Sequence, residues 1–527
     1  MGSLVISGVF SRGTDGFFHP TDEDDLRTLV DFARGSGRRV RVRGSIHSIP
    51  GAIYSGSDGP DAAHMDVMLD RMIRVSFDDT RREVTVQAGC HLGRDPRDHT
   101  RTSRWESSLT TQLERRGWAL PDLGGVTHQT VAGFLMTGSA GGSTRHSIYD
   151  AIVCVRMMDG TGAIHRWTRD DPRFFAVASS MGLLGILVDV TFACEPRYDV
   201  IGEERITSRS GAAFQWDPAG SHDASPRPSV AEFLRATEYA RFMWWPQRNV
   251  DRVVSWTAGR ASPRDLPEHR APSGKLTPKP YSALGDGLQN PALTPVVNYA
   301  SQLVAGAFYD SMAQSRRHRD TLLRALPPSS VVLSKLRDTF EEHVFPAVLD
   351  VFLPENTNSH QRFWGPWHHV LPMDNQMVDA FLPTDFTELW FDIDQADEVM
   401  CALQTHFHRG GLSATGTFLF EFYACSSSDF WMHPSYARDS FRVDVFWFKR
   451  NRGEAATFFE QFWQLLAPFG YRVHWGKHFP SWSSDPMRGC LASYPRVRDF
   501  LALRAACDPD GTFLNPHWSG LVAYGES

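Results

Sequence analysis

Residues 121–147 constrain the fold of this 527-residue chain more than any other stretch, because they hold too many glycines for a regular element. They read PDLGGVTHQTVAGFLMTGSAGGSTRHS, and most residues beside the glycines are small. Glycine weakens helices and strands, but it lets the backbone approach a bulky planar ligand closely. The stretch therefore predicts a loop that wraps such a ligand. Its glycines are Gly124, Gly125, Gly133, Gly138, Gly141 and Gly142.

A second glycine-containing turn lies upstream, in residues 38–51, which read RRVRVRGSIHSIPG. Valine and arginine alternate over 39–43, the period of a half-buried strand. Gly44 ends this strand, and residues 45–48 form a tight polar turn that contains His47. Such a turn can direct successive backbone N–H groups into one concavity that binds phosphate oxygens. From these residues alone, an ordinary surface loop with a solvated histidine remains the alternative.

The rest of the N-terminal third predicts ordinary elements. A helix opens at Thr21, carries acidic residues in its first turn and ends at Gly35. Residues 72–77 and 83–88 read as an antiparallel pair of strands. Residues 93–104 are charged and rich in turn formers, which predicts an exposed insertion. The remaining predicted elements are a short helix around Leu109 and Leu113 and a buried strand, ILVDVTFAC, at 186–194.

Composition and charge narrow the class of protein. Hydrophobic residues make up 42% of the chain, and its length predicts two or three folding units. A net charge of −7 with no long basic block argues against nucleic-acid binding. Seven cysteines without a CxxC pair argue against a disulfide framework or a zinc site, and the paired histidines at 368–369 and 406–408 have no third metal ligand at a useful spacing. The sequence predicts no signal peptide and no membrane span, so we expect a cytoplasmic protein.

The order of these motifs resembles a known family. The RGSIHS turn, the glycine-rich stretch and SSMGLLGILVDVTF resemble the FAD-binding domain of the vanillyl-alcohol-oxidase-like flavoproteins. HWGK at 474–477 and the tail at 494–518 are similar to the sugar-1,4-lactone and alditol oxidase branch, as are RFMWWP and GPWHHVLP in the middle. The resemblance implies an α+β protein with a two-subdomain FAD-binding domain and a cap domain whose sheet is mainly antiparallel. It places the FAD-binding domain at 1–200, the substrate-binding cap at 201–470, and a C-terminal segment that returns to the flavin at 471–527.

The resemblance implies FAD as the cofactor, joined covalently to His47. In the family, glycine often stands where this chain has Ile46, and a β-branched residue there disfavours a positive φ. The oxygen-access position falls on Ser139 or Ala140, whose small side chains favour an oxidase. No cysteine in 121–147 offers a second link. The residues implied for cofactor binding are Arg43, Gly44, Ser45, Ile46, His47, Ser48, Gly125, Gly133, Gly138, Ser139, Gly141, Gly142, Ser143, Gly182, Gly185, Ile186, Val188 and His474.

The resemblance also locates a substrate site, with departures from the family pattern. Lys477 matches the family lysine at the junction of flavin and substrate, and Glu421 matches the glutamate of an E-x-R motif. Tyr423 replaces its arginine. Further on, Asp444 replaces a histidine and Phe446 a threonine. These changes predict a more apolar and aromatic pocket, whose polar groups are Glu421, Tyr423, Asp444 and Lys477.

The leading interpretation is an FAD-dependent oxidase in which a hydride passes to flavin N5 and dioxygen becomes hydrogen peroxide. Its substrate would be an alcohol, amine or C–H group of a bulky, partly hydrophobic small molecule of specialised metabolism. Tyr423 or Asp444 would be the base, unless Asp444 only pairs with Arg442 or Arg438. The alternatives are a sugar-1,4-lactone or alditol oxidase, a dehydrogenase that uses a quinone or protein acceptor, and a non-catalytic flavin scaffold. The oligomeric state stays open.

Overall fold

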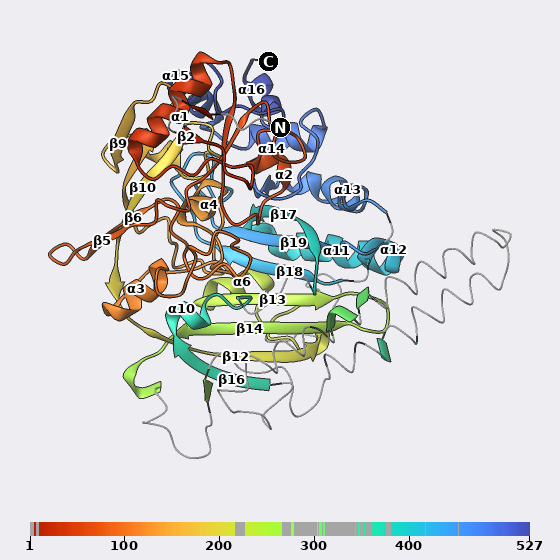
Figure 1. The fold of residues 1–527 in the computed structure, drawn as a ribbon. Coiled ribbons are helices and arrows are strands. Elements are labelled where there is room, and N and C mark those ends of the chain that lie inside the picture. The colour runs from red at the N-terminus through yellow and green to blue at the C-terminus, as the bar shows by residue number, and fades with distance from the viewer. Residues whose placement is uncertain are drawn as a thin grey trace.

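The computed structural model describes residues 5–6, 10–216, 227–265, 276–278, 360–375, 381–416, 418–451 and 453–526, with scattered positions between 303 and 353. In the described residues, no helix is both long and apolar enough to cross a membrane. Two sheets dominate the fold, one built early in the chain and one built from its middle (Figure 1). Their arrangement is the α+β class expected from the sequence.

The early part of the chain contains a five-stranded antiparallel sheet in the order β5-β6-β10-β8-β9. A separate parallel pair, β3 and β4, follows helix α1 in the chain, and β3 leads into the turn with His47. Strand β10 is buried along most of its length because it lies between β6 and β8. The bounds are α1 Glu23–Gly35, β3 Val40–Arg43, α2 Pro50–Ile53, β4 Met65–Met68, β5 Val75–Asp78, β6 Glu83–Gln87, α3 Leu109–Arg115, α4 Val131–Met136, β8 Ile152–Met158, β9 Ile164–Thr168, α5 Phe174–Val177 and β10 Ile186–Ala193.

The middle of the chain forms a nine-stranded sheet in the order β15-β16-β12-β14-β13-β18-β19-β17-β20. All its pairings are antiparallel except β15 with β16. The bounds are β12 Asp199–Ser208, α6 Val230–Ala236, β13 Tyr239–Trp245, β14 Arg252–Arg260, β15 Thr277–Pro278, β16 His360–Pro366, α10 Trp367–Val370, β17 Thr384–Asp392, α11 Ala396–Gly410, α12 Leu412–Thr415, β18 Phe420–Cys425, β19 Ser440–Phe448, α13 Ala455–Leu466 and β20 Arg472–Val473. Two short pairs complete the strands: β1 Val5–Ile6 with β2 Phe10–Ser11, and β7 Trp118–Ala119 with β11 Glu195–Pro196.

The C-terminal residues return to the start of the chain. Helices α14 Asp485–Ala492, α15 Val497–Cys507 and α16 Ser519–Glu526 lie at the same end of the molecule as α1 (Figure 1). The backbone N–H of Val40 donates to the carbonyl of Thr512 at 2.7 Å, and Ile49 N–H donates to the carbonyl of Gly476 at 2.9 Å. The strand and turn around His47 are therefore held from both ends of the sequence.

Most local predictions are confirmed, with shifts at the boundaries. The antiparallel pair forms as β5 and β6, and the short helix and buried strand form as α3 and β10. Asp22, not Thr21, caps the first helix, because its carboxylate accepts the N–H groups of Asp24 and Asp25. The glycine-rich stretch is not wholly irregular: α4 forms inside it, capped by Thr130, whose side chain accepts the N–H of Gly133.

Candidate active site

The RGSIHS turn, which follows β3, contains a left-handed residue at Ile46, a conformation that a β-branched side chain disfavours. Ile46 has a φ of 58° and its side chain is 45% exposed. The turn therefore keeps a left-handed residue although a β-branched side chain disfavours it. In the part of the chain that the structure describes, the N–H groups of residues 45–48 have no protein acceptor. The Ser45 hydroxyl anchors the turn by donating to the carbonyl of His128 at 2.7 Å.

Because left-handed backbone at a branched residue costs about 1–2 kcal/mol, Ile46→Gly is expected to raise the free energy of unfolding by about 1 kcal/mol. The exposed side chain loses little packing on removal. Urea unfolding followed by far-UV circular dichroism measures the change. Ile49→Gly is the matched control, since Ile49 has a φ of −61° and packs on the core, so this variant should lose stability. A loss of stability in Ile46→Gly as well would show that the left-handed backbone at Ile46 does not destabilise the protein.

Two arginines of β3 tie the turn to its surroundings. Buried Arg41 donates to the carbonyl of Phe513 at 3.1 Å and to that of Met181 at 2.8 Å. Met181, with a φ of 55°, belongs to the turn that precedes β10. Arg43 lies over the ring of Phe17 at 4.5 Å from its centroid and donates to the carbonyl of Gly44. Arg41 thus joins the two turns that the sequence predicts to contact the cofactor.

A deep cavity lies between these turns, and its walls are largely apolar. Strand β3 and its turn form one side, α4 and the residues after it form another, and the turn at 181–187 forms a third. Of the residues predicted to bind the cofactor or to act in catalysis, those that line the cavity are Arg43, Gly44, Ser45, Ile46, His47, Ser48, Gly133, Ser139, Gly182, Gly185, Ile186, His474 and Lys477. Those outside its lining are Gly125, Gly138, Gly141, Gly142, Ser143, Val188, Glu421, Tyr423 and Asp444.

The glycines outside the cavity lining have neighbours within the protein. A Cβ atom on Gly141 would lie 2.1 Å from the carboxylate of Asp122, and one on Gly142 would lie 2.6 Å from the carbonyl of Ala240. A Cβ on Gly125 would lie 2.8 Å from the carboxylate of Asp374. Close approach of protein groups therefore already requires glycine here, and contact of these residues with the cofactor stays a prediction.

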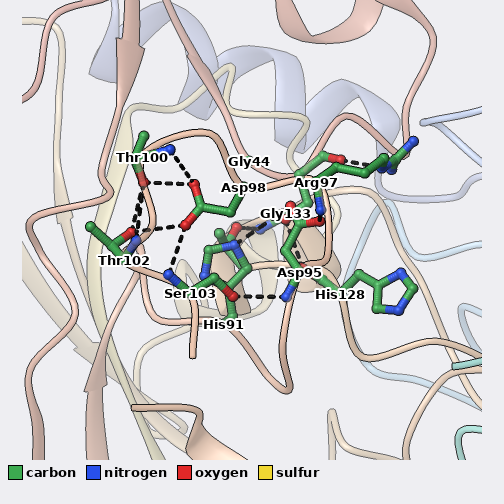
Figure 2. Close-up of polar contacts among 12 residues, drawn as sticks. Gly44, His91, Asp95, Arg97, Asp98, Thr100, Thr102, Ser103, His128 and Gly133 are labelled. Carbon is green, nitrogen blue, oxygen red and sulfur yellow. Dashed lines mark hydrogen bonds and ion pairs between the residues drawn. The ribbon is translucent and has the colours of Figure 1, made fainter. Parts of the chain in front are cut away.

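Residues of the segment 91–103 also line the cavity, a contribution that the sequence did not predict. Figure 2 shows the polar contacts within this segment. The sequence predicts an exposed insertion at 93–104, and this is wrong for part of that stretch, since Asp95 and Ser103 are buried. Arg97 from this segment reaches the turn, where its guanidinium donates to the carbonyl of Ser45 at 3.1 Å and to Nε2 of His47 at 3.3 Å. Charge and turn residues gave no signal that the segment folds back on the turn.

His47 is half-buried among positive groups. The ammonium of Lys477 donates to its carbonyl at 3.1 Å, and the ring of His128 lies 5.5 Å away. Burial, with Lys477 and Arg97 nearby, holds the pKa of His47 well below its usual range. The imidazole is therefore neutral at physiological pH, the form in which a ring nitrogen can act as a nucleophile.

His474, in the turn that packs against residues 47–49, also lines the cavity. Its Nε2 lies 3.2 Å from the hydroxyl of Ser139, and burial lowers the pKa of this histidine to about 4. Both His474 and His47 are therefore uncharged near neutral pH, and Lys477 is the cation shared by their surroundings.

Strands β17, β19 and β18 carry a row of three carboxyl groups across the sheet. Asp444 lies opposite Glu388 on one side and opposite Glu421 on the other. All three are buried. Directly opposed like charges repel strongly at this spacing, so the row requires compensating cations or bound protons.

Arg241 compensates Glu421. Its guanidinium, from β13, donates to the carboxylate of Asp374 at 2.5 Å and to that of Glu421 at 3.1 Å. The hydroxyl of Tyr423 donates to the other oxygen of Glu421 at 2.8 Å. Burial outweighs the opposing effect of Arg241 and raises the pKa of Glu421 to about 7. Glu421 can therefore exchange a proton near neutral pH, whereas burial raises the pKa of Tyr423 and keeps its phenol protonated.

Arg442 compensates Glu388 instead of Asp444. Its Nε donates to Glu388 at 2.9 Å, and its Nη1 donates to the carbonyl of Gly141 at 2.7 Å. Asp444 Oδ1 has no hydrogen-bond partner among the described residues. Burial and the neighbouring Glu388 raise the pKa of Asp444 well above its usual value, so its protonated form is favoured.

Aromatic rings adjoin the row of carboxyl groups. Phe446, two residues after Asp444, stacks on Phe386 with 5.0 Å between ring centroids and contacts Phe418 at 5.8 Å. The ammonium of Lys477 lies 3.7 Å from the centroid of Phe386. Lys477 therefore contacts both His47 in the cavity and Phe386 beside the row of carboxyl groups. Next to Lys477, the sheet carries a polar row of carboxyl groups and an adjacent pair of stacked aromatic rings.

The cavity suits a flavin dinucleotide. The N–H groups of residues 45–48 are available to phosphate oxygens, and Gly182 and Gly185 take positive φ values of 70° and 153° in the facing turn. The apolar lining suits a ring system, and the basic side chains of Lys477 and Arg97 suit an anion. These residues would hold FAD.

Comparisons with known proteins agree with this assignment. A family model described as "FAD binding domain" matches residues 14–94, and one described as "D-arabinono-1,4-lactone oxidase" matches residues 382–521. A putative D-arabinono-1,4-lactone oxidase of Neurospora crassa is 24% identical over 97% of this chain and 84% of its own length. The D-arabinono-1,4-lactone oxidase of Yarrowia lipolytica is 28% identical over 50% of this chain and 44% of its own length.

The fold has solved counterparts. The crystal structure of cholesterol oxidase from B. sterolicum aligns with a TM-score of 0.66, 14% identity, and coverage of 96% of this chain and 94% of that one. The row of carboxyl groups and Lys477 lie within residues 382–521, the stretch that matches the lactone oxidase model. The chain is an FAD-dependent oxidoreductase that has the fold of cholesterol oxidase and is similar in sequence to the sugar-1,4-lactone oxidases.

Proposed function

We propose that this protein is an FAD-dependent oxidase that oxidises an alcohol, amine or activated C–H group of a bulky, partly apolar small molecule. The observation that carries the proposal is the surface beside Lys477, where the carboxyl row meets Phe386 and Phe446. A substrate with one polar end and an apolar body matches both halves of this surface. The family pattern has a threonine at the position of Phe446, so the departure itself favours an apolar body.

We propose that His47 attaches the flavin covalently. A neutral imidazole in the cavity wall supports this, because alkylation requires a ring nitrogen with a free electron pair. Bound FAD supplies a two-electron acceptor, and dioxygen would regenerate it as hydrogen peroxide forms. Ser139 supports dioxygen as the acceptor, since its side chain at the cavity wall is small.

The protein's own part in the reaction is to orient the substrate and to accept its proton. Glu421 is the group suited to accept that proton, because its pKa of about 7 makes it a base near neutral pH. Tyr423 donates to Glu421 and favours its ionised form. Burial raises the pKa of Asp444 well above its usual value, which favours a role for this carboxyl as a hydrogen-bond donor to the substrate. Lys477 supplies a fixed cation that orients an oxygen or stabilises negative charge.

A sugar-1,4-lactone oxidase is the second candidate. The family model over residues 382–521 favours it, because this stretch includes Glu421 and Lys477. Several buried polar groups in one row could also bind the hydroxyls of a sugar. The two candidates differ in whether the apolar body of the substrate contributes to binding.

A substrate panel separates the candidates. Purified holoprotein is mixed without oxygen with aldonolactones, alditols, and aromatic, long-chain and secondary alcohols and amines, and loss of flavin absorbance is followed. We expect faster reduction by bulky alcohols or amines than by sugar lactones, and hydrogen peroxide when air is admitted. Faster reduction by sugar lactones would select the second candidate, and reduction by no compound in any class would indicate a non-catalytic flavin protein.

A further inference from the structure

Side-chain hydrogen bonds within the segment 91–103 hold its backbone in place. The carboxylate of Asp98 accepts the N–H of Thr100 at 2.9 Å and that of Ser103 at 2.7 Å (Figure 2). The hydroxyl of Ser103 then accepts the N–H of Asp95 at 2.8 Å. His99 of this segment also contacts the carboxylate of Asp15, which lies outside it, at 3.1 Å. These bonds fix the backbone on both sides of Arg97.

Arg97 is the residue that this structure presents to the turn. The carboxylate of Asp95 accepts its N–H at 2.9 Å. Its side chain then bridges the carbonyl of Ser45 and Nε2 of His47 with one nitrogen, Nη2. The guanidinium of Arg97 thus contacts the residues on both sides of Ile46, the residue with the left-handed backbone.

The chemistry of the two groups decides the state of the ring. A guanidinium has donors only, so Nε2 of His47 must accept the bond and keep its electron pair there. In a neutral imidazole the ring proton is then on Nδ1. The bond to Arg97 therefore leaves Nδ1 as the nitrogen that can lose its proton and form a new bond.

We propose that Arg97 is a positioning residue for flavin attachment, which holds the His47 ring by Nε2 and leaves Nδ1 to react. This inference rests on the proposed covalent link at His47. Attachment replaces the N–H of Nδ1 and one methyl C–H of the flavin ring with an N–C bond. The two hydrogens and their electrons pass to dioxygen, which becomes hydrogen peroxide. Arg97 keeps its bond to Nε2 throughout, because the product imidazole still has its electron pair there.

The test measures attachment itself. Full-length protein produced under riboflavin limitation is mixed with FAD in air, and the flavin that stays with acid-precipitated protein is measured over time. A hydrogen bond to a charged group is worth about 1.5–3 kcal/mol, so Arg97→Met should attach flavin about tenfold more slowly or worse. Arg97→Lys should be intermediate, since it keeps the charge and loses the fork. Arg94→Met, an exposed arginine of the same segment, is the matched control and should match the parent protein.

The pH dependence distinguishes positioning from a structural effect. Arg97, Lys477, His128 and His91 all lower the pKa of His47, so removal of Arg97 alone should raise it. Attachment by Arg97→Met should then need a higher pH than in the parent, whereas a merely looser fold would slow attachment equally at every pH. Attachment by both Arg97 variants at the parental rate overturns the role of Arg97. Absence of attached flavin in the parent would instead overturn the covalent link and this inference with it.

Discussion

Replacement of Glu421 by glutamine is expected to lower kcat by about 10²- to 10⁴-fold, the contribution typical of a general base. Glutamine keeps the shape and can still accept the bond from Tyr423, but it cannot take a proton. In the parent protein, kcat/KM should rise with pH through about 7, because Glu421 becomes ionised over that range. Steady-state oxygen consumption with the best substrate of the panel, measured between pH 5 and 9, gives both quantities.

Two further variants sharpen this prediction. Tyr423→Phe removes a bond that lowers the pKa of Glu421, so the rise in kcat/KM should move to higher pH. Glu398→Gln, an exposed glutamate of α11, should leave the profile unchanged. If Glu421→Gln retained the rise near pH 7, another group would be the base.

Arg442→Met should destabilise the protein by about 3–5 kcal/mol, because it leaves the buried carboxylate of Glu388 without its cation. The loss extends to the glycine-rich stretch, since Arg442 also donates to the carbonyls of Ala140 and Gly141. Urea unfolding of the holoprotein measures the change. The second substitution in Glu388→Gln/Arg442→Met removes the unpaired charge and should recover part of the loss.

Arg488→Met is the control for this variant. Arg488 pairs with Asp485 on the surface, where an ion pair contributes about 1 kcal/mol or less. A loss in Arg442→Met no greater than in Arg488→Met would show that the buried pair does not hold the glycine-rich stretch to the sheet.

Local patterns in the sequence predict local structure well. Alternation predicts β3 and the β5–β6 pair, and the capped, amphipathic stretch after Thr21 predicts α1. The RGSIHS turn lies in the stretch that matches the FAD binding domain model, and HWGK lies in the stretch that matches the lactone oxidase model, so motifs in the sequence predict the cofactor. None of these inferences needs to know which distant residues meet.

The parts that the sequence did not predict all depend on distant contacts. Glu388 became a member of the site because the register of β17 places it opposite Asp444. Arg241 reaches Glu421 from β13, and Arg97 reaches His47 from a segment with no regular element. At Ile46 the local sequence disfavours the conformation that forms. Distant contacts of Ser45 with His128 and with Arg97 accompany this left-handed backbone.

The covalent link proposed between His47 and FAD can be measured directly. The direct measurement is to precipitate the holoprotein with acid, digest it, and determine the mass of the peptide that contains His47, with His47→Ala as the control. We predict a yellow precipitate and a flavin mass on that peptide, both absent in His47→Ala. A colourless precipitate with all the flavin in solution, or a flavin mass on a different peptide, would show that His47 does not bind the flavin covalently.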